Sequence, residues 1–295
     1  MKKTTWLLLL LIVWIGSNER IVAQTVDTNI LVGTEWLEQN MEKEIHLIDV
    51  RVGGYQTGHI PGAVHMPIDL IEDKKHPIRG YLVGKVDFEN IMRDHGVRTD
   101  DTIVIYDKGG DTAATRLFYA LEYYGHLNVK VLDGGFAAWE AAEKKITTEM
   151  KKVQLGDFKA IEKSELRKEK TEVKEAIGEE GVILLDVRST AEYLGEDVRA
   201  KRGGHIPTAV NLEWKNVLRP GEVALFKSRN ELVSLLEAVG VTKDKTIIIY
   251  CQRANRASHM YFTLRLLGYD KVSVYEGSWE EWGNVDDTPI VNPSE

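Results

Sequence analysis

An internal repeat constrains the fold of this 295-residue chain more than any other feature of its sequence. The segment Leu47–Arg51 (LIDVR) returns as Leu184–Arg188 (LLDVR), and GHIPGAV at residues 58–64 returns as GHIPTAV at 204–210. Further matching pairs follow in the same order, about 140 residues apart. Because the units of a solenoid are only about 20–50 residues long, this offset indicates two duplicated domains.

Short apolar runs alternate with amphipathic stretches in each copy. Buried strands are expected at residues 45–50, 102–106, 129–132, 182–187, 246–250 and 272–275. Stretches with helical spacing, such as 86–95 and 231–239, are each followed by a glycine, which is common just after a helix. Strands that alternate with helices predict an α/β fold in each copy, with a parallel sheet covered on both faces.

The composition along the chain predicts its divisions. Residues 1–24 have a basic start, a short apolar run and a polar stretch, which is typical of a secretory signal peptide. The run is too short to cross a membrane, which takes about 20 residues, although a retained N-terminal anchor is the alternative. We therefore expect an exported protein, periplasmic or secreted, with no stable membrane association. The first domain is expected at 25–145, a Lys- and Glu-rich linker at 146–160, and the second domain at 161–295.

Charge and cysteine content exclude several functions. The formal net charge of −8 argues against a general nucleic-acid binder, which needs a basic surface for the phosphates. The chain has one cysteine, Cys251, so a disulfide within the chain and a CxxC-type metal or redox site are both excluded. We expect no bound metal, and the single thiol becomes the main candidate for chemistry.

Cys251 lies where a strand is expected to end and a helix to begin. It follows the apolar run that ends at Tyr250, and residues 257–267 have helical spacing. Ligands of open α/β sheets bind at the carboxyl ends of the strands, and a helix N-terminus favours anions. Because Arg253 and Arg256 add positive charge, we predict that Cys251 reacts as a thiolate and that these groups hold an anionic substrate. The alternative is a buried, inert thiol.

The first copy lacks this arrangement. Tyr106 is followed by Asp107, so no thiol is available, and Asp111 adds a second carboxylate where the other copy has arginines. The loop is also about one residue longer. We therefore predict that the first domain is catalytically silent and serves packing, shapes the cleft between the domains, or binds a partner.

These segments together resemble the tandem-domain rhodanese family, the thiosulfate and 3-mercaptopyruvate sulfurtransferases. The most specific matches are LDVR at 185–188, RGGHIP at 202–207, YCQRANRAS at 250–258, and EGSW at 276–279 with Trp282. The resemblance covers nearly all of the chain after residue 24. It implies two α/β domains, each a five-stranded parallel sheet with helices on both faces, an inactive first domain and a catalytic cysteine in the second.

The resemblance also implies a ping-pong sulfur transfer. The Cys251 thiolate would take the outer sulfur of thiosulfate as a persulfide, and a thiophilic acceptor such as cyanide or a thiol would then remove it. The expected substrate-binding residues are Gln252, Arg253, Ala254, Asn255 and Arg256 in the loop, with Asp186, which would orient a loop arginine, and Arg199. The expected partners are small molecules, the expected state is a monomer, and no metal or organic cofactor is needed.

Other donors and reactions remain open. Two loop arginines favour thiosulfate, and Glu192 stands where many mercaptopyruvate enzymes have an arginine, although Arg199 could take that role. Ala254 replaces the glycine of many members, which argues against a positive φ there. A phosphatase needs five residues between its cysteine and arginine, whereas four separate Cys251 and Arg256. A sulfur-relay or binding module for a redox partner is the remaining alternative.

Overall fold

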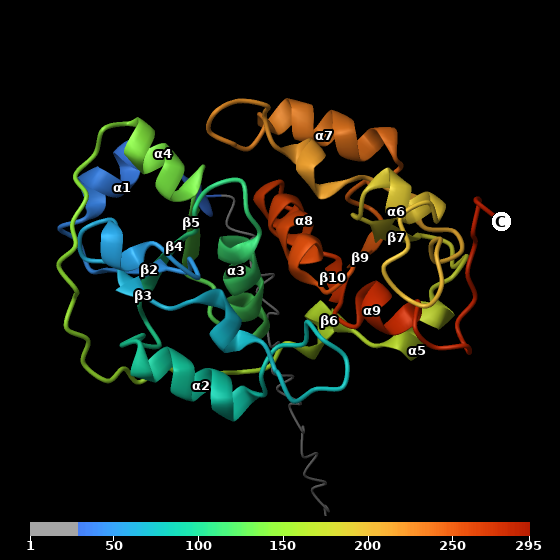
Figure 1. The fold of residues 1–295 in the computed structure, drawn as a ribbon, viewed down its shortest axis with the longest axis horizontal. Helices are drawn as coiled ribbons and strands as arrows, with labels where there is room; N and C mark the ends of the chain where they lie inside the picture. Colours follow the sequence, from blue (N-terminus) through green and yellow to red (C-terminus); the bar gives the residue numbers. More distant parts are fainter. Residues whose placement is uncertain (1–28) are drawn as a thin grey trace, which may run out of the picture.

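The repeat in the sequence corresponds to two parallel sheets in the computed structural model, which describes residues 29–295 (Figure 1). The predicted signal peptide at 1–24 lies outside the described residues. The strands of the first sheet are β1 (Leu31–Val32), β2 (Ile45–Asp49), β3 (Val64–His65), β4 (Thr102–Tyr106) and β5 (Val129–Leu132). Those of the second are β6 (Arg167–Lys168), β7 (Val182–Asp186), β8 (Val210–Asn211), β9 (Thr246–Tyr250) and β10 (Val272–Tyr275).

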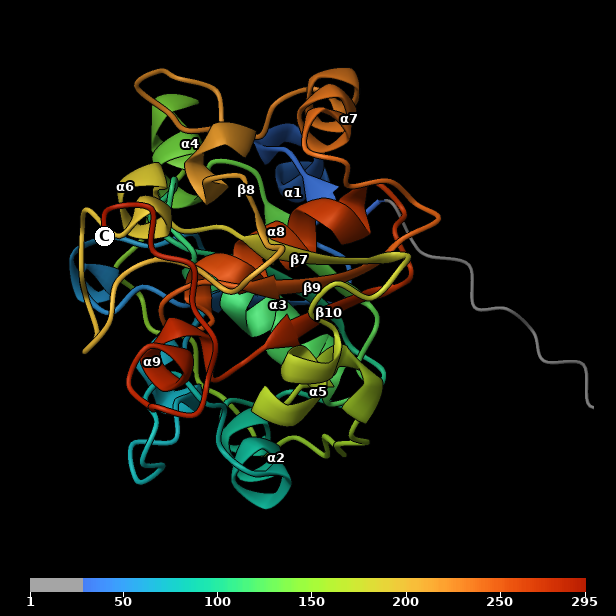
Figure 2. The same cartoon turned by 90° about the vertical axis from the view of Figure 1, so that its right-hand side faces the viewer.

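The two sheets have the same topology. Their orders are β1-β5-β4-β2-β3 and β6-β10-β9-β7-β8, and all their pairs are parallel. Figure 2 shows β7, β9 and β10 side by side. Tyr106 is paired with Asp49, and Tyr250 with Asp186, so the residues after both tyrosines leave the carboxyl end of a central strand. The predicted α/β fold with two five-stranded parallel sheets is confirmed.

Helices cover both faces of each sheet. The first unit contains α1 (Thr34–Asn40), α2 (Lys85–Asp94), α3 (Ala113–Tyr123), α4 (Gly135–Ala141) and the 3-10 turns η1 (Tyr55–Thr57) and η2 (Ile68–Ile71). The second contains α5 (Lys170–Glu175), α6 (Thr190–Leu194), α7 (Arg229–Ala238), α8 (Asn255–Leu266), α9 (Ser278–Trp282) and the turns η3 (Ser164–Leu166) and η4 (Trp214–Val217). The helices predicted at 86–95, 231–239 and 257–267 are α2, α7 and α8, within two residues at each end.

The two units share one apolar core, which runs between the sheets through α3 and α8 (Figure 1). Phe118 meets Phe262 edge to face at 4.8 Å. Arg116, near the start of α3, donates to Ser258 near the start of α8 at 3.1 Å. The first turns of both helices therefore lie close together.

The segment predicted as a linker, 146–160, contains no helix and lies along the first unit. The N–H of Phe158 donates to the carbonyl of Val97, and the Phe158 ring is buried in the core. Burial of this apolar side chain holds the segment against the first unit. Among the described residues, no helix is both long enough and apolar enough to cross a membrane.

Candidate active site

Cys251 begins the tight loop between β9 and α8 and is buried. The loop is held by Ser278 at the start of α9, whose Oγ accepts the N–H of Cys251 at 3.2 Å and that of Ala254 at 3.3 Å. The Ser278 hydroxyl in turn donates to the carbonyl of Tyr275. Sequence reasoning missed Ser278 as a site residue, because its partners are more than 20 residues away in the chain.

Ala254 has a φ of 62°, so the expectation that alanine would exclude a positive φ is wrong. A non-glycine residue in the left-handed region costs about 1–2 kcal/mol. Hydrogen bonds offset this strain. The Ala254 N–H is held by Ser278, and its carbonyl accepts both the N–H of Ser258 at 2.8 Å and the Ser258 hydroxyl at 2.9 Å. The buried turn brings the first residues of α8 beside the thiol.

Several backbone N–H groups of the loop have no partner within the described part of the chain. They belong to Gln252, Arg253, Arg256 and Ala257. The first N–H groups of a helix have no carbonyl to bond inside the helix, and a cluster of them binds anions. The loop around Cys251 is therefore a set of donors without acceptors.

In the first unit, a carboxyl side chain of the chain itself accepts the N–H groups of the corresponding loop. Asp107 takes the place of Cys251 after the central strand, and its carboxylate accepts the N–H of Gly109 at 2.8 Å and of Ala114 at 3.1 Å. Ala114 is the second residue of α3. Its counterpart near the start of α8 is Ala257, whose N–H is free within the described residues.

Arg256 is locked by a carboxylate rather than free. Its Nη1 and Nη2 donate to Oε2 and Oε1 of Glu192 at 2.6 and 2.8 Å. Burial alone would raise the pKa of Glu192, but the hydrogen bonds and charge of Arg256 outweigh burial and lower it to about 2. Burial lowers the pKa of Arg256, but the hydrogen bonds of Glu192 and the charge interactions with Cys251 and Glu192 outweigh burial and raise it. The guanidinium of Arg256 is thus held by a buried carboxylate and interacts electrostatically with Cys251.

Arg253 and Gln252 are held on the side of α9. Glu280 accepts the Arg253 Nε at 3.2 Å and the Gln252 amide at 3.3 Å. The same carboxylate pairs with Arg79, which belongs to the first unit, at 2.6 Å. The first unit therefore reaches the Cys251 loop of the second through one shared carboxylate.

Asp186 has another partner than expected, whereas Arg199 lies beside Glu192. Asp186 does not orient an arginine of the loop, because Arg188 takes both its oxygens, at 3.0 and 2.5 Å, and then reaches the carbonyl of Gly204. Asp186 is wholly buried and offers no oxygen to a substrate. Arg199 is half-exposed; it pairs with Asp197 at 2.5 Å and lies 3.7 Å from Glu192.

The surroundings of Cys251 therefore contain four arginines (Arg79, Arg199, Arg253 and Arg256) and three carboxylates (Glu192, Asp197 and Glu280). Each of these arginines has a carboxylate partner, with Arg79 and Arg253 sharing Glu280, and the backbone N–H groups of the loop add further positive potential. In the part of the chain that the structure describes, no three His, Cys, Asp or Glu side chains gather in a way that could hold a metal ion.

Comparison with known proteins finds the rhodanese-like domain in two stretches, residues 33–142 and 169–284. The chain is 36% identical to the sulfur carrier protein TtuD of Thermus thermophilus, over 90% of this chain and 98% of that protein. It is 32% identical to a thiosulfate sulfurtransferase of Pseudomonas aeruginosa, over 84% of this chain and 91% of that protein. The solved structure of SseA, a 3-mercaptopyruvate sulfotransferase from Escherichia coli, matches with a TM-score of 0.77 and 30% identity. The match covers 85% of this chain and 99% of that chain.

Proposed function

Because the chain belongs to the rhodanese family and is a sulfurtransferase with two rhodanese-like domains, we propose that it moves the outer sulfur of thiosulfate to a thiophilic acceptor through a persulfide on Cys251. The first domain, which has Asp107 in place of the cysteine, is catalytically silent in this proposal. The acceptor is a small thiol or cyanide.

One observation carries the proposal, namely the free N–H groups around Cys251. A persulfide anion projecting from Cys251 would gain the hydrogen bonds that Asp107 receives in the first unit from Gly109 and Ala114. Charge-assisted bonds of this kind are worth about 1.5–3 kcal/mol each. They would stabilise both the thiolate and the persulfide without a free side-chain cation.

The reaction then has two steps. The Cys251 thiolate attacks the outer sulfur of thiosulfate, and the sulfur–sulfur bond of thiosulfate breaks with its electron pair leaving on sulfite. An acceptor then attacks the outer sulfur of the persulfide, and the electron pair of that bond returns to Cys251. Arg256 keeps its position throughout, since Glu192 holds its guanidinium, and the backbone N–H groups would stabilise the charge on sulfur.

The pairing of Arg256 supports thiosulfate over 3-mercaptopyruvate as donor. A carboxylate substrate is bound best by a free two-donor edge of a guanidinium, and Glu192 already occupies the Nη1–Nη2 edge of Arg256. The sulfite group of thiosulfate can be held by the backbone donors instead. The test is kcat/KM for both donors on purified protein; a higher value for thiosulfate is expected, and a higher value for 3-mercaptopyruvate would refute this choice.

A sulfur carrier is the second candidate, because TtuD is named a sulfur carrier protein and is 36% identical over 90% of this chain. In that case the persulfide would pass to a protein instead of a small thiol. Transfer of labelled sulfur to a co-purifying protein, without turnover of thiosulfate and cyanide, would favour it. We also propose export by the segment at 1–24; a protein of full length in the cell interior would contradict it.

A further inference from the structure

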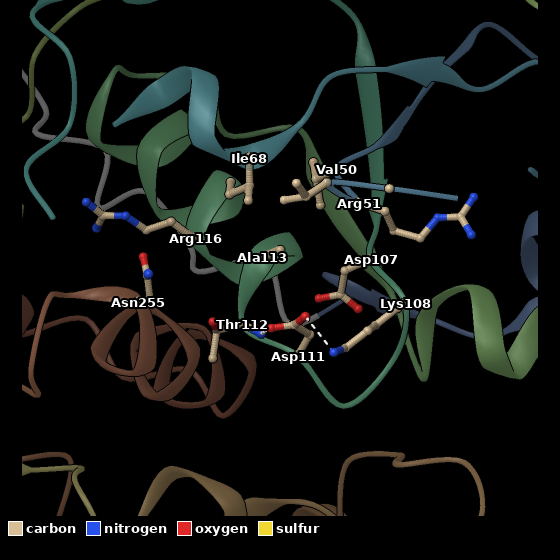
Figure 3. Close-up of a pocket in the computed structure, with 12 residues that line it drawn as sticks. Val50, Arg51, Ile68, Asp107, Lys108, Asp111, Thr112, Ala113, Arg116 and Asn255 are labelled. Atoms are coloured by element: carbon tan, nitrogen blue, oxygen red, sulfur yellow. Dashed lines mark hydrogen bonds and ion pairs between the residues drawn. The ribbon is translucent and has the colours of Figure 1, made fainter. Parts of the chain in front are cut away.

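A cavity of about 430 Å³ lies at the carboxyl ends of β2 and β4 in the first unit (Figure 3). In an α/β sheet this is the edge where ligands bind. Val50, Val52 and Ile68 give it an apolar wall, and Asp107 and Asn255 give it polar groups. Asn255 belongs to the second unit and starts α8, only four residues after Cys251. The cavity therefore borders the catalytic loop.

The two arginines that line the cavity have their charges matched elsewhere. Arg51 pairs with Asp49 at 2.6 Å, and Arg116 pairs with Glu276 at 2.7 Å. Figure 3 shows both guanidinium groups extending to opposite sides, away from the Asp107 carboxylate. Neither arginine can serve as the counter-ion of that carboxylate.

Asp107 has no ion pair within the described residues, although it is only 6% exposed. Buried carboxylates are nearly always paired with a cation. Burial raises the pKa of Asp107. The two N–H groups that its carboxylate accepts lower this pKa, but burial outweighs them. The nearby Lys108 lies 3.5 Å from Asp111, which balances its charge. The polar end of the cavity thus offers a buried carboxyl group that has no ion pair among the described residues.

We propose that this cavity binds the protonated amine of a small aminothiol, with Asp107 as its counter-ion, and that this aminothiol is the sulfur acceptor. The assignment as acceptor rests on the proposed function, whereas the amine site does not. An anionic donor such as thiosulfate would be repelled by Asp107. Asn255 lines the same cavity as Asp107, so the cavity extends to the first residue of the helix that follows the loop of Cys251.

The transfer step is balanced within this pair of reactants. The thiolate of the aminothiol attacks the outer sulfur of the Cys251 persulfide and forms a new sulfur–sulfur bond. The old bond breaks, and its electron pair remains on Cys251 as the thiolate. The product is the persulfide of the aminothiol, and no oxidant or reductant is consumed.

The amine site is tested by equilibrium binding, without turnover. Calorimetry compares 2-(methylthio)ethylamine with 2-(methylthio)ethanol, which have the same length and cannot exchange sulfur. The wild-type protein should bind the amine about tenfold tighter, the effect of one charge-assisted contact. D107N should remove the preference, and the exposed D87N, outside the cavity, should keep it. A113L places a larger side chain of α3 in the cavity and should weaken the binding of both probes. This variant tests the site if D107N does not fold. Equal binding of both probes to the wild-type protein would overturn the proposal.

The acceptor role is tested by kinetics. After persulfide formation, cysteamine and 2-mercaptoethanol are compared as acceptors at equal thiolate concentration. A preference of about tenfold for cysteamine that D107N abolishes and D87N retains supports the role. Amine binding without this preference overturns the acceptor role and leaves the amine site standing. If neither thiol takes sulfur while the amine still binds, the proposed function has failed, not the site.

Discussion

The carboxylate of Glu192 meets the guanidinium of Arg256 through two bonds of 2.6 and 2.8 Å, although 64 residues separate them in the sequence. The Glu192 side chain is 1% exposed, so water does not compete for this pair. The charge of Arg256 is therefore already neutralised by Glu192, so this arginine of the Cys251 loop is no free cation.

Replacing Glu192 should change donor preference. In E192Q the neutral amide cannot hold both N–H groups of Arg256 as strongly, so the guanidinium becomes available to a carboxylate. The ratio of kcat/KM for 3-mercaptopyruvate to that for thiosulfate should rise about tenfold, the effect of one such contact. E196Q removes an exposed carboxylate just after α6, the helix that contains Glu192, and should leave the ratio unchanged. A fall of the ratio in E192Q would contradict this account.

Ser278 should matter for activity because it holds the loop of Cys251. S278A leaves the N–H groups of Cys251 and Ala254 without their acceptor. We expect a loss of about 1–3 kcal/mol in the free energy of unfolding and at least about a tenfold loss of kcat/KM. The matched control is S273A on the neighbouring β10, since the Ser273 hydroxyl is buried and has no partner among the described residues. Urea unfolding measures the loss of stability, and sulfite release measures the loss of activity. Equal losses of both in S278A and S273A would refute the role of Ser278.

Buried ion pairs add to the apolar core between the two units, and one of them joins Arg116 to Glu276. Arg116 of α3 pairs with Glu276 and is 5% exposed, so R116M leaves a buried carboxylate with only Arg167 nearby. Loss of one partner of a buried pair costs about 3–5 kcal/mol. Arg79 makes an exposed pair with Glu280, and R79M should cost less than about 1 kcal/mol. Urea unfolding of both variants checks the difference; similar small losses would show that the buried pair does not hold the units together.

Acid should destabilise the fold partly through His259. This side chain lies between Phe226 and Trp214 in the core, and burial lowers its pKa from 6.5 to about 3. The unfolded chain takes up a proton below about pH 6.5 that the folded protein does not accept, so stability falls as the pH drops. At pH 5 this amounts to about 2 kcal/mol. H259F should lose that part of the pH dependence. An equal fall in the free energy of unfolding between pH 7.5 and pH 5 in H259F and the wild-type protein would contradict this role of His259.

The sequence predicted those features that depend on local patterns. The apolar runs ending at Tyr106 and Tyr250 placed the strand ends, and the helical spacing after Cys251 placed α8 within two residues. The position of Cys251 at a strand-to-helix turn followed from these two patterns alone.

Features that depend on distant residues were missed or wrong. The positive φ of Ala254 is stabilised by Ser278, and Asp186 pairs with Arg188 rather than with a loop arginine. Neither periodicity nor spacing could show which carboxylate each arginine would meet. The contact of Glu280 with Arg79 joins residues about 200 positions apart.

The central claim is that Cys251 carries the sulfur, and intact-protein mass spectrometry after addition of thiosulfate tests it most directly. We predict a mass increase of one sulfur atom on Cys251, one sulfite released for each protein, and return to the original mass when an acceptor thiol is added. C251S should show neither the mass increase nor the sulfite. Sulfite release by C251S at the rate of the unmodified protein would contradict the account.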